Sequence, residues 1–357
     1  MSNNSKSIDK IQLSAQIKQW GLALGFQQVG ITDTHLELYE SRLTAWLEKN
    51  YHGSMDYMQK HGEKRSQPEK LIPGTIRIIS VRMDYLPPDS KIKQTLINKT
   101  KAYIARYALG RDYHKVLRKR LEKLANKIQE NIGAFGYRAF VDSAPVLEKP
   151  IGEKAGLGWI GKNTLLINKK AGSYFFLGEI YTDLDLPIDI ISDTKSHCGS
   201  CSACITICPT QAIIAPYVLD ARKCISYLTI ENKTSIPLEF REAIGNRVFG
   251  CDDCQLCCPW NKFAKFTQET DFHPKHKLDN SNLIDLFLWS EEEFLNKTTG
   301  SAIRRAGYEG WLRNLAVGLG NAPSSPEIIA ALKSRENHES ELVREHVRWA
   351  LSKHLSS

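Results

Sequence analysis

The sequence predicts a mixed α+β protein with three parts, on the strength of three observations. Residues 1–190 alternate between helical and strand patterns, residues 191–270 contain all nine cysteines, and residues 271–357 have only helical patterns. We therefore expect an N-terminal α/β domain, a ferredoxin-like domain with two iron–sulfur clusters, and an all-α tail with HEAT-like repeats.

The first part has one helical pattern and several strand patterns. Apolar residues recur at helical spacing over 14–24. Runs of β-branched, aromatic and other apolar residues predict the strands 76–81, 138–142, 164–167 and 174–182.

The strand at 138–142 ends in an acid, Asp142. Folds of the α/β class place ligands at the carboxyl ends of their strands, so Asp142 is a candidate site residue. The Ser-Ala-Pro that follows also suits a helix N-cap, and both interpretations of Asp142 stand.

A glycine-rich loop, residues 156–163, lies between two predicted strands. It matches G-x-G-x-x-G and nearly matches a phosphate-binding loop, but no helix follows it, and Asn163 has no hydroxyl for Mg²⁺. Two interpretations remain: a turn that lets backbones pack closely, or a backbone surface against a flat ligand.

Positive charge is concentrated in one stretch. The chain has a net charge of +8, and residues 91–123 contain eleven Lys or Arg against Asp112 and Glu122. Such a stretch can bind phosphates. It can equally be the solvated face of a helix, because Leu117, Leu121 and Leu124 recur at helical spacing.

The first cysteine group predicts an iron–sulfur cluster. It follows the C-x2-C-x2-C-x3-C-P spacing of bacterial ferredoxins, in which three thiolates bind one [4Fe–4S] cluster and the fourth binds the other. An odd cysteine count without a secretory leader argues against disulfides, and zinc sites usually separate two C-x2-C pairs by a longer loop. The residues are Cys198, Cys201, Cys204 and Cys208.

The second group repeats this pattern with one ligand missing. When Cys258-Pro is aligned with Cys208-Pro, Cys254 and Cys251 fall on the third and second positions, and Val248 falls on the first. Cys224 is then the remaining candidate, while Cys257 lies off the pattern and is the alternative. The predicted ligand sets are Cys198, Cys201, Cys204 and Cys258 for one cluster, and Cys208, Cys224, Cys251 and Cys254 for the other.

The tail contains two similar helical segments. Residues 310–321 resemble residues 342–351, with Arg313 and Arg344 31 residues apart and Asn321 to Pro326 breaking the helices between them. This period is typical of a short HEAT-like stack, which binds a partner or caps the rest of the protein.

Composition excludes several classes of protein. Hydrophobic residues make up 42% and charged residues 25%, the balance of an ordinary globular chain. No apolar run approaches the ~18–20 residues that span a bilayer, and the polar start is unlike a secretory signal. We expect a cytoplasmic protein with no membrane association.

The motifs together resemble the epoxyqueuosine reductase family, which performs the last step of queuosine synthesis in bacterial tRNA. The resemblance covers nearly the whole chain. It rests on the ferredoxin run and on Val141-Asp-Ser-Ala-Pro-Val-Leu147, Ala155-Gly-Leu-Gly-Trp-Ile-Gly-Lys-Asn163, Arg222-Lys-Cys-Ile-Ser-Tyr-Leu-Thr229, Gly250-Cys-Asp-Asp-Cys-Gln255 and Cys258-Pro-Trp-Asn261.

The resemblance implies a corrinoid-binding N-terminal domain, two [4Fe–4S] clusters, and a tRNA-binding tail. It implies base-off cobalamin as the reducing nucleophile, with Arg65, Asp142 and Ser226 at the corrinoid and Asp142 as general acid, its pKa raised by burial. In the corrinoid-binding pattern D-x-H-x-x-G, the histidine binds cobalt. Leu117 replaces the glycine of this pattern here, so we do not expect His114 to bind cobalt.

The implied partners are tRNA carrying epoxyqueuosine in its anticodon and an external low-potential electron donor, with the enzyme a monomer. One departure is Cys257, where the family usually has an apolar residue. Two rival functions remain: a reductive dehalogenase-like corrinoid enzyme, and a non-catalytic ferredoxin-type electron carrier.

Overall fold

The computed structural model describes residues 9–88, 91–142, 144–190 and 196–355. Its main sheet has four strands in the order β1-β2-β7-β4, and every neighbouring pair is antiparallel. The strands are β1 (Gln28–Thr32), β2 (Arg77–Asp84), β7 (Phe175–Thr182) and β4 (Tyr137–Phe140).

The positions of β2, β4 and β7 confirm the sequence-based expectation, whereas β1 was not predicted and the strand directions correct the expected fold class. The segments 174–177 and 179–182 form the single strand β7, and β4 ends two residues before Asp142. Antiparallel pairing makes this part α+β rather than α/β, because a hydrophobic pattern marks a strand without fixing its partner.

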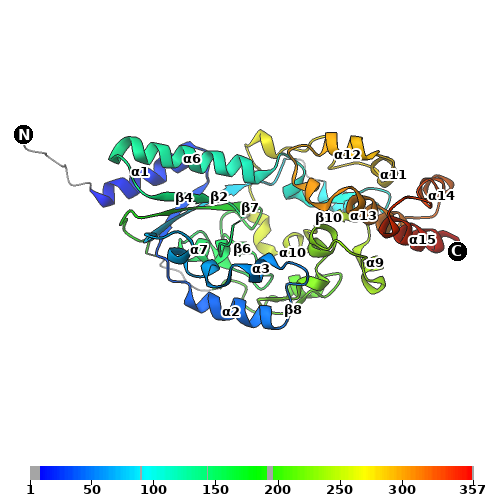
Figure 1. The fold of residues 1–357 in the computed structure, drawn as a ribbon, viewed down its shortest axis with the longest axis horizontal. Helices are drawn as coiled ribbons and strands as arrows, with labels where there is room; N and C mark the ends of the chain where they lie inside the picture. Colours follow the sequence, from blue (N-terminus) through cyan, green and yellow to red (C-terminus); the bar gives the residue numbers. More distant parts are fainter. Residues whose placement is uncertain (1–8, 89–90, 143, 191–195, 356–357) are drawn as a thin grey trace, which may run out of the picture.

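Helices cover both faces of this sheet (Figure 1). Helices α1 (Lys10–Ala23) and α6 (Tyr113–Ile132) lie on one face, where Ile17 and Leu121 join the buried core. Helix α7 (Glu148–Lys154) packs on the other face, through Ile151. The smaller elements around them are α2 (Glu37–Glu48), α3 (Tyr57–Lys60), α4 (Pro68–Leu71), α5 (Ile92–Ile97), and the hairpin of β5 (Trp159–Ile160) with β6 (Leu166–Ile167).

The cysteine-containing part consists of short elements. They are α8 (Ala203–Ile207), the hairpin of β8 (Ile213–Ala215) and β9 (Val218–Leu219), a π-helix η4 (Tyr227–Glu231), α9 (Leu238–Ile244), β10 (Arg247–Phe249) and α10 (Asp253–Leu256). Strand β10 pairs in parallel with β3 (Tyr103–Ile104), so this part shares a ladder with the N-terminal part.

The tail is helical, as the sequence predicts. The two similar segments form α13 (Tyr308–Gly320) and α15 (Glu341–Leu355), which pack together, with α14 (Pro326–Lys333) between them in the chain. Helices α11 (Leu283–Phe287) and α12 (Glu291–Lys297) precede them. The core of the tail also includes Ile104 and Phe249, so it is continuous with the rest of the protein.

Buried polar side chains of α13 attach the tail to the π-helix. Arg313 donates to the carbonyls of Leu228, Asn232 and Thr234. Asn314 donates to the carbonyls of Thr229 and Val248, at 2.7 and 2.9 Å. These donors satisfy carbonyls that the irregular backbone leaves unpaired, and so hold the segment that follows Cys224.

Replacing Asn314 by Leu should therefore destabilise the protein and loosen the π-helix. Two buried carbonyls would lose their donor, which we expect to lower the free energy of unfolding by about 2–4 kcal/mol in urea denaturation. Amide hydrogen exchange over 227–232 should become faster.

Asn321→Leu is the matched control, because Asn321 donates to the carbonyls of Arg241 and Gly245 instead. This variant should lower the free energy of unfolding without accelerating amide hydrogen exchange over 227–232. Unchanged exchange there in the Asn314 variant would contradict the anchoring role.

Candidate functional site

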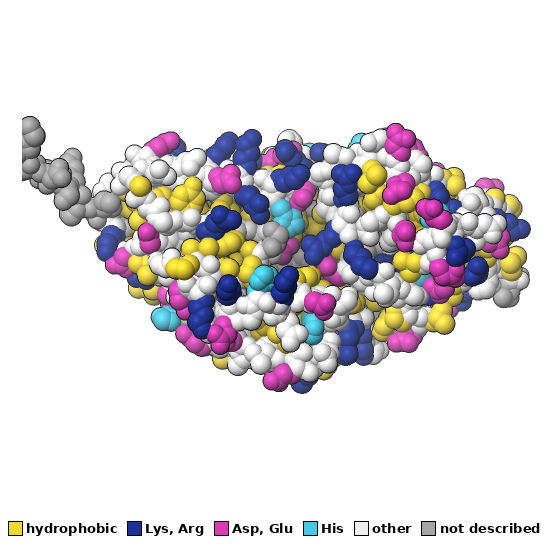
Figure 2. Space-filling model, in the orientation of Figure 1, with side chains coloured by type: hydrophobic (Ala, Val, Ile, Leu, Met, Phe, Trp, Pro, Cys, Tyr) yellow, Lys and Arg dark blue, Asp and Glu magenta, His cyan; other side chains and the backbone are white. Residues whose placement is uncertain are grey.

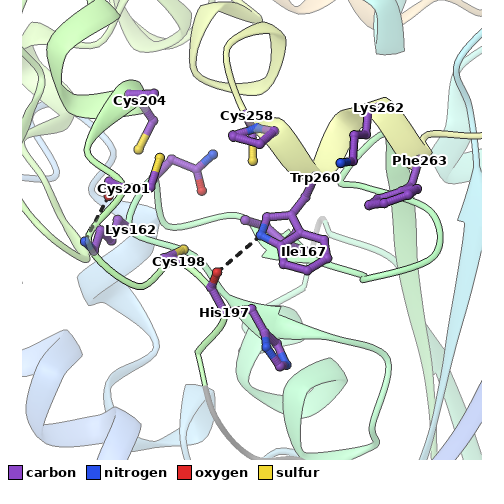
Figure 3. Close-up of a pocket in the computed structure, with 13 residues that line it drawn as sticks. Lys162, Ile167, His197, Cys198, Cys201, Cys204, Cys258, Trp260, Lys262 and Phe263 are labelled. Carbon is purple, nitrogen blue, oxygen red and sulfur yellow. Dashed lines mark hydrogen bonds between the residues drawn. The ribbon is translucent and has the colours of Figure 1, made fainter.

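One cysteine set lines a cavity of about 350 Å³ (Figure 3). Its thiols come from the loop before α8, from α8 itself, and from the residue before the short helix at Pro259–Phe263. They belong to Cys198, Cys201, Cys204 and Cys258, the first predicted ligand set.

The second predicted set lies deeper. Cys208, Cys224 and Cys254 are close enough for their charges to interact. Burial, followed by the neighbouring Cys224, raises the pKa of the Cys254 thiol well above its ordinary value. The Cys251 thiol donates to Asp253 at 2.8 Å.

Cys257, which the sequence left as an alternative, lies beside the first set. Burial, with Cys204 and Cys258 nearby, raises the pKa of its thiol to about 12. Its sulfur contacts the Cys254 carbonyl at 3.6 Å. It therefore stands between the two sets, at the residue that follows α10.

The donor chemistry of the two sets fits iron–sulfur clusters. Among the described residues, no three His, Cys, Asp or Glu side chains gather closely enough to hold a single metal ion. A cluster of four irons takes one thiolate per iron, so it holds its thiolates further apart than a single ion does.

The glycine-rich loop packs against both cysteine sets. A Cβ on Gly158 would lie 2.2 Å from the carbonyl oxygen of Ile167, so the close-packing interpretation is confirmed. Lys162 donates to the carbonyls of Gly199 and Cys201 at 2.7 and 2.9 Å, and Asn163 donates to that of Cys254 at 3.2 Å. The loop thus positions the backbone that carries the thiols.

A second cavity, of about 480 Å³, lies between the N-terminal part and the tail. Arg65 and Asp142, two of the predicted corrinoid contacts, both line it. Aromatic, apolar and ionisable side chains also line this cavity. They are Tyr57, Tyr107, Tyr113, His114, Val146, Leu147, Glu148, Lys149 and Arg305.

Asp142 is held in this cavity from three directions. The Tyr113 hydroxyl donates to its carboxylate, and His114 Nε2 lies 3.4 Å from Asp142 Oδ2. The Asp142 backbone N–H donates to the Glu148 carboxyl at 2.6 Å, and its φ of 48° lies in the left-handed region. The N-cap interpretation is wrong, because α7 begins only at Glu148, after Leu147.

The charges in the cavity correct the expected pKa of Asp142. Burial in the cavity raises the pKa of Asp142, but hydrogen bonds from His114 and Tyr113 outweigh the effect of burial and hold this pKa below its ordinary value. Burial lowers the pKa of His114, yet Asp112 and Asp142 raise it to about 9. Burial and the charge of Asp142 raise the pKa of Glu148 to about 8. Near neutral pH, Asp142 is thus an anion beside a protonated His114 and a protonated Glu148.

The other two predicted contacts differ in position. Arg65 is buried and donates to the Tyr57 carbonyl at 2.9 Å, while its Nε has no partner among the described residues. Ser226 is absent from the lining of this cavity; it precedes the π-helix, and its hydroxyl and backbone N–H donate to the Cys224 thiol.

Sequence reasoning missed Tyr113, Glu148 and Arg305 as site residues. Asp112 caps α6 by accepting from the backbone N–H of His114 at 3.1 Å, so the Asp-Tyr-His run does mark this corner. No local pattern shows that residues 142–150 fold back onto it.

The predicted basic helix borders the same corner. Leu117, Leu121 and Leu124 are buried, as helical spacing required. On the face in Figure 2, Lys and Arg side chains gather along α6 and across the middle of the molecule. A groove there is lined by Asp112, His114, Lys115, Arg118, Lys119, Glu122 and Arg305.

Arg120 departs from the expected basic face. Its guanidinium donates to the Leu24 carbonyl and pairs with Glu269, so it holds α6 against neighbouring segments.

No helix within the described residues is long and apolar enough to cross a membrane.

Two family models match the chain. "Epoxyqueuosine reductase QueG, DUF1730" matches residues 65–143, which include Arg65 and Asp142. "4Fe-4S double cluster binding domain" matches residues 197–261, which include all nine cysteines.

Full-length relatives are similar throughout. Epoxyqueuosine reductase of Pseudomonas aeruginosa is 63% identical over 354 residues, covering 99% of this chain and 98% of its own length. That of Escherichia coli is 56% identical, covering 98% and 92%.

Solved structures agree with these relatives. A crystal structure of epoxyqueuosine reductase with an epoxyqueuosine-modified tRNA-Tyr stem loop has a TM-score of 0.88 at 28% identity, covering 96% of this chain and 90% of that one. The Bacillus subtilis enzyme, with its catalytic aspartate loop swung out of the active site, has a TM-score of 0.84 at 27% identity, covering 96% and 90%.

Proposed function

The chain belongs to the epoxyqueuosine reductase family, and from this premise we propose that it reduces epoxyqueuosine in tRNA to queuosine. The observation that carries the proposal is similarity over nearly the whole chain, which includes the cavity of Asp142, the cysteine sets and the tail. A bare electron carrier would need neither that cavity nor the tail.

We propose that the cysteines hold two [4Fe–4S] clusters. Cys198, Cys201, Cys204 and Cys258 would bind one cluster, and Cys208, Cys224, Cys251 and Cys254 the other. The shared cavity of the first set and the proximity of Cys208, Cys224 and Cys254 support this division. Cys251 would have to leave Asp253 to bind iron.

The cavity of Arg65 and Asp142 fits a cobalamin. The unpaired Nε–H of buried Arg65 offers a donor, the aromatic walls offer apolar surface, and Ser226 would meet the group from the cysteine side. When bound, cobalamin supplies a reduced, nucleophilic cobalt centre. His114 lies between Asp112 and Asp142 and is protonated near neutral pH, so it has no lone pair for cobalt, which supports a base-off cofactor.

The side chains around Asp142 can supply protons. Reduction of an epoxide to an alkene takes up two electrons and two protons and releases water. We propose Asp142 as the group that protonates the epoxide oxygen. Because Asp142 is an anion here, it must first receive a proton, and protonated His114, 3.4 Å away, is the proposed donor. Glu148 holds the backbone of Asp142 in place.

The tRNA would lie over this cavity. The groove of Lys115, Arg118, Lys119 and Arg305 borders it and presents positive charge to phosphates. A related enzyme binds a modified tRNA stem loop, which supports the same partner here.

The three-part division also remains a proposal: residues 1–190 for the corrinoid, 191–270 for the clusters, and 271–357 as a HEAT-like tRNA-binding tail. The packing of α13 on α15 supports the last of these. We expect a cytoplasmic monomer that takes electrons from an external donor.

Asp142→Asn should bind both clusters and cobalamin yet turn over at least ~100-fold more slowly, because an amide cannot supply the acid proton. Turnover is measured by mass spectrometry of tRNA, which follows loss of the epoxide oxygen. Wild-type turnover should also fall as pH rises through about 9, where the pKa of His114 lies and its proton is lost.

His114→Gln separates the proposed role of Asp142 as the acid from that of His114 as the source of its proton. It keeps Asp142 but removes the cation, so the pH at which turnover falls should move below that of the wild type. Near-normal turnover of Asp142→Asn, with clusters and cobalamin bound, would contradict the donor role.

Cys224→Ala should lose about half of the bound iron, because one of two clusters lacks a ligand. Cys257→Ala should retain nearly all of it. Both are measured by iron and sulfide analysis of anaerobically prepared protein. Wild-type iron content in the Cys224 variant would overturn the assignment.

Reversing Arg118 and Lys119 to Glu should weaken tRNA binding roughly 10-fold or more and flatten its salt dependence, because fewer counterions are released. Lys127→Glu, an exposed site further along α6, is the control. Arg120 is left intact because of its pairing with Glu269. Unchanged affinity would leave these residues as a solvated helix face.

A further inference from the structure

The segments that surround the first cysteine set are rich in lysine and contain no Asp or Glu. They are residues 158–173, 196–217 and 258–268, and their five charged side chains are all lysines. The chain as a whole mixes both signs, with 48 basic and 40 acidic residues. These lysines are Lys162, Lys169, Lys170, Lys262 and Lys265.

Two lysines and two phenylalanines form an exposed patch beside these thiols. Phe263 is 39% exposed and Phe266 57% exposed. Lys262 lies 4.8 Å above the Phe263 ring, and both line the rim of the cavity in Figure 3. Within the described part of the chain, neither Lys262 nor Lys265 is ion-paired with a carboxylate.

This side of the protein is where electrons can enter. Cys201 is exposed to solvent, whereas Cys208, Cys224, Cys251 and Cys254 are each only partly exposed. The π-helix that begins three residues after Cys224 supplies Ile230 and Glu231 to the wall of the cavity of Asp142. The deeper cysteine set therefore lies toward the proposed reaction site, and the first set lies toward solvent.

We propose that the patch of Lys262, Phe263, Lys265 and Phe266 is the docking site for a small acidic electron-transfer protein that carries one electron at a time. This rests on the proposed function, because it needs clusters on the cysteines. Each encounter oxidises the carrier by one electron and reduces a cluster by one, so two encounters supply the two electrons of one turnover.

The chemistry of the patch fits this partner. Ammonium groups that form no ion pair attract an acidic surface and raise the rate of encounter, while exposed aromatic rings give a small apolar contact that releases readily. Nucleic acid is a less suitable occupant, since it would cover the thiol-bearing face that a reductant must reach. The groove assigned to the tRNA shares no lining residue with the cavity of the first cysteine set.

The test compares two reductants on the holoenzyme without tRNA. In stopped flow, an acidic flavodoxin in its fully reduced form should bleach the iron–sulfur absorbance of wild type with a rate constant that falls with salt. Lys262→Glu/Lys265→Glu should lower that rate constant about 10-fold at low salt and weaken its salt dependence. Lys123→Glu/Lys127→Glu, at two exposed sites on α6, is the charge-matched control and should match wild type.

Excess dithionite gives the total of reducible clusters, independent of docking. It should be equal in wild type and the double variant. An unchanged flavodoxin rate in the double variant, or a loss of tRNA affinity instead, would overturn the docking site. Absence of dithionite-reducible clusters in wild type would overturn the proposed function itself.

Discussion

Asp142 carries a negative charge, and its backbone adopts a conformation that non-glycine residues seldom adopt. The rest of the site depends on the contacts that stabilise this charge and this conformation. A left-handed φ costs about 1 kcal/mol. The Glu148 carboxyl accepts the Asp142 N–H, while Tyr113 and His114 face its side chain. Asp142, the start of α6 and the start of α7 are thereby fixed to one another.

A second constraint connects this cavity to the cysteines. The π-helix after Cys224 ends near the cavity wall at Ile230 and Glu231, and α13 satisfies its carbonyls through Arg313 and Asn314. Buried donors of this kind are costly unless fully paired, so they specify one arrangement. The tail therefore positions the thiol segment as well as extending the surface available to tRNA.

The sequence predicted what depends on local spacing and missed what depends on long-range contact. Ligand spacing placed the cysteines in two sets, and leucine spacing gave the buried side of α6. Strand direction could not be predicted, because β2 finds its partner β7 almost a hundred residues later. The pKa of Asp142 was predicted with the wrong sign, since Tyr113 and His114 approach from 28 or more residues away in the chain. Arg120 belongs to a basic run, yet its position is decided by Glu269.

Electrons and protons reach the proposed reaction site from different sides. The segments around the first cysteine set contain lysines and no Asp or Glu, whereas the cavity of Asp142 gathers Asp142, Glu148 and His114. Both proposed macromolecular partners, tRNA and an acidic carrier, are anionic, and on one shared basic surface they would compete. Their two surfaces share no lining residue, so a carrier can deliver the second electron while the modified nucleotide is still bound. That arrangement suits a reaction that consumes two electrons delivered singly, because the substrate need not leave between them.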